Sequence, residues 1–61
     1  MDDNAEEYRG MPVERARERA AERGWTTVRE LEPGALITLE FRADRLNLAV
    51  RDGEVERAWV G

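Results

Sequence analysis

The sequence predicts an α+β domain in which one helix packs on one face of a small twisted sheet. Three observations support this prediction. A helical repeat of apolar residues is bounded by Pro12 and Gly24, an alternation that places Leu46, Leu48 and Val50 on one face runs from Arg45 to Arg51, and the pair Asp52-Gly53 follows it directly. The helix comes first and the strands come afterwards, which is typical of α+β domains.

The helix is expected between Pro12, which suits a first helical turn, and Gly24, which suits a left-handed stop position. Small apolar residues recur there with helical spacing, at Val13, Ala16, Ala20 and Ala21. Arginine and glutamate fill the rest of the circumference, where mixed charges three residues apart support a solvated helix. The apolar stripe is narrow, so the helix can lie close against a sheet.

The strands are predicted from β-prone runs separated by turn residues. The first is Thr26 to Leu31, which ends at the turn sequence 32–34. Arg45 to Arg51 is the clearest strand because its leucines and Val50 fall on one face. Asp52-Gly53 is a hairpin signal, and residues 54–60 form the returning strand.

Residues 1–9 are polar and acidic, and we expect a flexible segment with little structure before a domain at residues 10–61. Four acids account for the net charge of −4, because the remaining acids balance the arginines. These four are Asp2, Asp3, Glu6 and Glu7. The rest of the chain is neutral and has no basic stripe, so we expect no nucleic-acid partner.

The composition argues against an enzyme. The 61 residues include no cysteine and no histidine, which removes thiolate ligands, disulfides and the commonest general base. We therefore expect no catalytic residues, no metal and no cofactor in a chain too short to form a sizeable pocket. The sequence has no run of 18 apolar residues, and Met1 is followed by acids rather than by a signal sequence. We therefore expect a cytoplasmic protein without a membrane partner, with secretion after processing as the alternative.

Ala35 to Phe41 is the most apolar stretch, and its alternation at Ile37, Leu39 and Phe41 is that of a core strand. No glycine, proline or asparagine follows to close a hairpin into the strand at Arg45. Two interpretations remain open at this point. The stretch is either a strand of the sheet or an extended, exposed recognition segment.

The run from Ile37 to Leu46 resembles the reactive-site loop of the potato inhibitor I family of serine protease inhibitors. The shared pattern is an apolar residue, threonine, a variable residue, an acid, an aromatic or aliphatic residue, arginine, two variable positions, arginine and an aliphatic residue. The resemblance covers residues 10–61 and is closest to short microbial relatives of that family. Further matching residues are Gly10, Val13, Glu14, Ala16, Pro33-Gly34, Asp52-Gly53, Val55 and Val60-Gly61.

The resemblance implies a mixed sheet in which Thr26 to Leu31 and Arg45 to Arg51 are parallel strands joined by a long exposed loop. It implies a protease partner that is subtilisin-like or chymotrypsin-like, with Leu39-Glu40 as the scissile bond. The protease-binding residues would be Ile37, Thr38, Leu39, Glu40, Phe41 and Arg42.

The resemblance also implies that side chains on the second parallel strand brace the loop. Arg45 fits this role toward Thr38 and Glu40, whereas Asn47 occupies the place of the family's second arginine. Asparagine is shorter and uncharged, so a charge-assisted bond is lost or made differently. A loop braced in this way is either an inhibitor or, if it is held loosely, a substrate.

An alternative is a non-inhibitory interaction module that uses Leu36 to Phe41, since an exposed apolar segment also suits protein binding. We expect a monomer, with self-association through the same segment as the alternative. Trp25 and Trp59 are expected in or beside the small core, which needs large apolar side chains.

Overall fold

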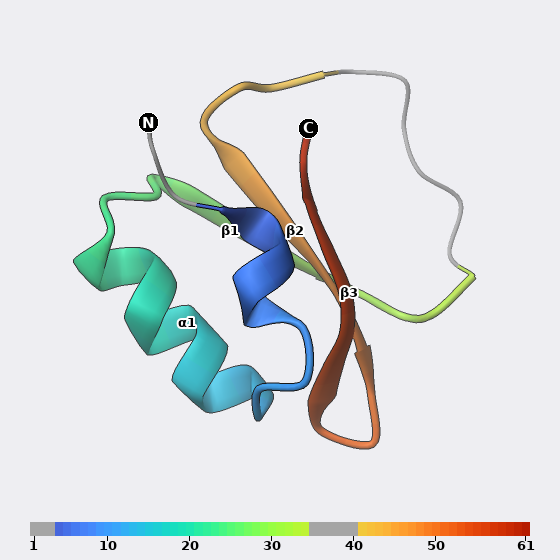
Figure 1. The fold of residues 1–61 in the computed structure, drawn as a ribbon. Helices are drawn as coiled ribbons and strands as arrows, with labels where there is room; N and C mark the ends of the chain where they lie inside the picture. Colours follow the sequence, from blue (N-terminus) through green and yellow to red (C-terminus); the bar gives the residue numbers. More distant parts are fainter. Residues whose placement is uncertain (1–3, 35–40) are drawn as a thin grey trace.

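The computed structural model describes residues 4–34 and 41–61 (Figure 1). Over these residues the chain forms a short 3₁₀ helix, one α-helix and a three-stranded sheet, which confirms the predicted α+β fold. In chain order the elements are η1 (Ala5–Tyr8), α1 (Val13–Glu22), β1 (Thr27–Leu31), β2 (Arg45–Arg51) and β3 (Glu54–Val60). Figure 1 shows η1 and α1 on the same side of the sheet.

The helix α1 lies where the proline and glycine predicted it. Pro12 precedes the first turn with a φ of −57°, and Gly24 follows the helix with a φ of +89°. That conformation is unfavourable for residues with a Cβ, so glycine allows the chain to turn from α1 toward β1. Ala16 and Ala20 are fully buried, which brings the helix close to the sheet as the narrow stripe predicted.

The sheet is mixed, with β2 at its centre in the order β1-β2-β3. β1 runs parallel to β2, with Thr27 opposite Arg45, and β2 runs antiparallel to β3. The hairpin between β2 and β3 turns at Asp52-Gly53, both with positive φ, as the sequence predicted. An irregularity at Ala49/Val50 shifts the register of this hairpin.

The core lies between the helices and one face of the sheet. Leu46 and Leu48 of β2 are fully buried there, against the two alanines of α1. Further members of the cluster are Tyr8, Trp25, Val55 and Ala58. Alternation along β2 then places Arg45 and Asn47 on the opposite face, where the structure describes no helix.

The N-terminal segment corrects the prediction of little structure, because residues 4–9 are ordered against the sheet. The Asn4 side chain accepts a hydrogen bond of 3.0 Å from the backbone of Glu6 and caps η1. Tyr8 is fully buried in the core cluster. The tyrosine ring packs in the same cluster as the two buried alanines of α1 and supplies apolar area that these small side chains lack.

The chain that follows η1 pairs with β3 and covers the first part of its outer edge. The backbone N–H of Gly10 donates to the carbonyl of Val55, and the N–H of Val55 donates to the carbonyl of Met11, both at 2.8 Å. The N–H of Val13 donates to the carbonyl of Gly53 at 2.8 Å. The folded unit therefore begins before residue 10.

Candidate functional site

The candidate site is the connection between the parallel strands β1 and β2, residues 32–44. Of the six predicted protease-binding residues, Phe41 and Arg42 are described, and Phe41 is 72% exposed. The predicted positions Ile37, Thr38, Leu39 and Glu40 lie outside the described residues. The structure therefore defines the two flanks of the connection and the strands that support it.

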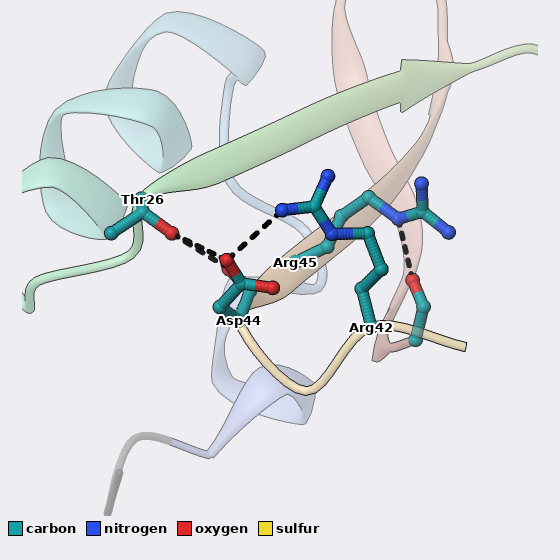
Figure 2. A network of polar contacts seen from close by, with 5 residues as sticks. Thr26, Arg42, Asp44 and Arg45 are labelled. Atoms are coloured by element: carbon teal, nitrogen blue, oxygen red, sulfur yellow. Dashed lines mark hydrogen bonds and ion pairs between the residues drawn. The ribbon is translucent and has the colours of Figure 1, made fainter. Parts of the chain in front are cut away.

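The C-terminal flank is tied to the start of β1 through one carboxylate oxygen. Thr26 Oγ1 donates to Asp44 Oδ2 at 2.9 Å, and Arg42 Nη2 lies 3.2 Å from the same oxygen (Figure 2). The threonine hydrogen bond, with a smaller contribution from the Arg42 guanidinium, holds the pKa of Asp44 below its ordinary value of 3.8. The carboxylate is thus ionised at neutral pH and holds both partners.

Arg45, predicted to brace the loop, is 8% exposed and is not an ordinary surface arginine. Its Nε donates to the carbonyl oxygen of Gly61 at 2.7 Å (Figure 2), and its own carbonyl accepts from the Gly61 N–H at 3.1 Å. Arg45 thereby joins the start of β2 to the residue after β3. Its predicted bonds to Thr38 and Glu40 fall on residues that are not described.

Asn47 is fully buried beside Arg45, two residues further along β2. Its Oδ1 accepts from Arg29 Nε at 2.8 Å, and its Nδ2 donates to the carbonyl oxygens of Gly61 at 2.8 Å and Trp59 at 3.4 Å. Asn47 therefore links all three strands. The side chain hydrogen-bonds through both its donor and its acceptor, which explains why a short amide suits this position.

Arg29 is a residue of this polar cluster that the sequence analysis missed. It lies directly opposite Asn47 in the parallel register, so a second guanidinium, besides that of Arg45 on β2, reaches this face of the sheet from β1. The placement of Arg29 depends on the register of the two parallel strands. That register cannot be assigned from the sequence before the long connection is understood.

The model of the peptidase inhibitor I78 family matches residues 4–59. The chain belongs to the peptidase inhibitor I78 family. No curated protein matches the sequence. The expectation of a protease inhibitor family is confirmed, whereas the family identified is I78 rather than potato inhibitor I. The match includes residues 4–9, in agreement with the structural role of η1 and Tyr8.

The I78 domain also has a shallow hollow on the sheet face that carries Asn47. Arg57 lies over the Trp59 ring, with 5.5 Å between the guanidinium carbon and the ring centroid, and Arg51 pairs with Glu56 at 3.4 Å. Other lining residues are Leu31, Glu32, Pro33, Gly34 and Ala49. Trp25 is buried in the core as predicted, whereas Trp59 is half-buried at this hollow, on the sheet face opposite the core.

Two further findings apply to residues 4–34 and 41–61, the part of the chain that the structure describes. No helix in this part of the chain is both long enough and apolar enough to cross a bilayer. In the same residues, acidic side chains do not gather in groups of three that could hold a metal ion.

Proposed function

We propose that the chain inhibits subtilisin-like or chymotrypsin-like serine proteases with residues Ile37 to Arg42, which enter the enzyme as a substrate does. The observation that carries the proposal is I78 membership combined with the position of this segment between two parallel strands. Parallel strands need a long crossover, which is commonly helical. Here the apolar alternation of Ile37, Leu39 and Phe41 fits an extended segment that a protease can bind.

The choice of target class rests on Leu39, which takes the specificity position in the resemblance to potato inhibitor I. A leucine side chain suits an apolar pocket, as in chymotrypsin-like and subtilisin-like enzymes, whereas a trypsin-like pocket requires a cation. The scissile bond is then Leu39-Glu40. I78 membership also favours an inhibitor over an enzyme.

The chemistry follows from the way serine proteases cleave peptides. The enzyme's serine attacks the Leu39 carbonyl carbon, the bond to the Glu40 nitrogen breaks, and an acyl-enzyme forms with a free amine on Glu40. In an inhibitor this amine stays beside the acyl group and attacks it, which re-forms the peptide bond and releases the serine. Inhibition therefore requires that both sides of the scissile bond are held in place.

The hydrogen bonds of Arg45, Asn47 and Asp44 favour a segment whose two sides are held in place. Arg45 and Asn47 are buried on the sheet face for which no helix is described. Asp44 joins the C-terminal flank to Thr26. A segment held in its binding conformation loses less entropy when it binds, so a small domain can bind tightly.

The test exchanges the residue offered to the specificity pocket. Leu39→Arg should weaken inhibition of subtilisin and chymotrypsin and create inhibition of trypsin, whereas Leu39→Gly should weaken inhibition of subtilisin and chymotrypsin without creating inhibition of trypsin. Glu18→Gln, on the solvent face of α1, is the matched control and should leave the inhibition constants unchanged. Unaltered inhibition by both Leu39 variants would refute the assignment of the scissile bond.

The alternative function is a non-inhibitory interaction module that uses Leu36 to Phe41, and the 72% exposure of Phe41 favours it. Such a module would bind a protein partner or a second copy of the chain without blocking proteolysis. Sedimentation of the parent and of Phe41→Ser distinguishes self-association from the monomer that we propose. A monomer that leaves all three proteases fully active would favour the module.

A further inference from the structure

The C-terminal flank of the connection is closed by a compact turn at residues 42–45. The backbone N–H of Arg45 donates to the carbonyl of Arg42 at 3.2 Å. Arg42 and Asp44 are also joined through their side chains, 3.2 Å apart, so the turn is closed by a backbone bond and by an ion pair. This closure alone would leave the turn attached to the fold only through β2.

Asp44 attaches the same turn to a second strand. The parallel pairing of β1 and β2 begins at Thr27 opposite Arg45, and the residues just before this pair are Thr26 and Asp44. Their side chains are joined by the 2.9 Å hydrogen bond from Thr26 Oγ1 to Asp44 Oδ2 (Figure 2). The side-chain bond therefore continues the strand pairing by one position, toward the connection.

One carboxylate oxygen thus fixes the exit of the connection from two directions. Arg42 approaches it from the connection itself and Thr26 approaches it from the first residue before β1. Glu40, at the amine side of the proposed scissile bond, precedes Arg42 by two residues. Whatever holds Arg42 and Asp44 also limits how far that amine can move once the bond is cut.

We propose that Asp44 is a positioning residue for inhibition, and that its bonds to Thr26 and Arg42 keep the Glu40 amine close enough to re-form the Leu39-Glu40 bond. This inference rests on the proposed function. Asp44 makes no bond to the reacting atoms. It acts by holding the leaving segment, which raises the effective concentration of the amine over that of water at the acyl-enzyme.

Loss of the bonds of Asp44 changes the competition between two reactions of the acyl-enzyme. The acyl-enzyme at Leu39 either receives the Glu40 amine, which restores the intact chain, or receives water, which gives a free Leu39 carboxylate and leaves the Glu40 amine. Loss of the bonds of Asp44 lowers the effective concentration of the Glu40 amine in the first reaction and leaves that of water in the second unchanged. Because the same effective concentration contributes to the free-energy difference between intact and cleaved chain, the cleaved form should gain relative to the intact form at equilibrium.

The experiment measures the ratio of intact to cleaved chain at equilibrium with catalytic subtilisin, starting from each form, by intact-mass spectrometry. Asp44→Ala removes both bonds, Thr26→Val removes the hydroxyl, and Thr26→Ser keeps it. Asp44→Ala and Thr26→Val should lower the ratio by about threefold, a change within the range of exposed ion pairs, while Thr26→Ser retains the parent ratio. Glu56→Gln breaks an ion pair of similar exposure on β3 and should also match the parent.

Melting temperatures are recorded for every variant, because a merely structural role would change stability without changing the ratio. Should Asp44→Ala fail to fold, the Thr26→Val and Thr26→Ser pair carries the test. Parent-like ratios in the folded variants, or an equal fall in Glu56→Gln, would overturn the inference while inhibition by the parent stands. A parent that neither inhibits subtilisin or chymotrypsin nor is cut at Leu39-Glu40 would instead refute the proposed function.

Discussion

Replacing Asn47 with leucine tests whether the polar cluster of Arg29, Arg45 and Asn47, on the sheet face opposite the core, stabilises the fold. The amide is fully buried, accepts from Arg29 and donates to the carbonyl of Gly61, both at 2.8 Å. Leucine fills similar space but supplies neither a donor nor an acceptor. A buried bond from a charged donor contributes about 1.5 to 3 kcal/mol and a neutral one about 1 kcal/mol.

We therefore expect Asn47→Leu to lower the free energy of unfolding by about 3 kcal/mol, out of a total of about 5 to 15 kcal/mol for a small domain. At this size the melting temperature should fall by roughly 12 to 24 °C. Thermal and urea unfolding, followed by circular dichroism, give both quantities.

A double-mutant cycle with Arg29→Leu separates the shared bond from general damage to the core. If the bond is real, the double variant should be more stable than the sum of the single losses indicates, by about 1.5 to 3 kcal/mol. Single losses that add to within about 0.5 kcal/mol would refute the reasoning, as would an Asn47→Leu chain that melts with the parent.

Three further predictions follow from the described residues. Tyr8→Ala should lower the free energy of unfolding by about 3 to 5 kcal/mol, because the ring is fully buried, and a urea midpoint equal to the parent's would contradict the role of η1 in the core. The carboxyl of Asp44 should titrate below 3.8 by carbon NMR, so its stabilising contribution is present above pH 3.8 and is lost as the pH falls through the folded-state pKa. Thr26→Val should return this pKa toward 3.8, and an unchanged midpoint would show that Thr26 is not the main cause. Arg45→Ala should cost about 1.5 to 3 kcal/mol of stability through its lost bond to Gly61 and should accelerate cleavage at Leu39-Glu40, so equal cleavage rates in the variant and the parent would exclude a bracing role.

Much of the fold could be predicted from local chemistry. Pro12 and Gly24 bracketed α1 because each favours a backbone conformation found at helix ends, and alternation located β2 because its leucines face the core while Arg45 and Asn47 lie on the opposite face. Tyr8 was missed because a lone aromatic residue among acids has no periodicity. Its burial depends on the packing of η1 beside α1 on the sheet, which is a tertiary property.

The site was less predictable because its contacts join distant residues. Arg45 was singled out through a family resemblance, and its burial agrees with a structural role. The bonds of Asp44 to Thr26 and of Asn47 to Arg29 depend on the parallel register of β1 and β2, which a local pattern does not specify. Asn47, which occupies the place of the family's second arginine, is bonded to an arginine of the neighbouring strand, Arg29 of β1.

The most direct test of inhibition is a titration of active subtilisin, and in parallel of chymotrypsin, with the purified chain, while intact-mass spectrometry follows the chain itself. We expect that the activity of at least one enzyme falls in proportion to the chain added and vanishes near equimolar amounts, with most of the chain still intact. Full activity of both enzymes together with rapid, complete cleavage at Leu39-Glu40 would show a substrate and contradict the account.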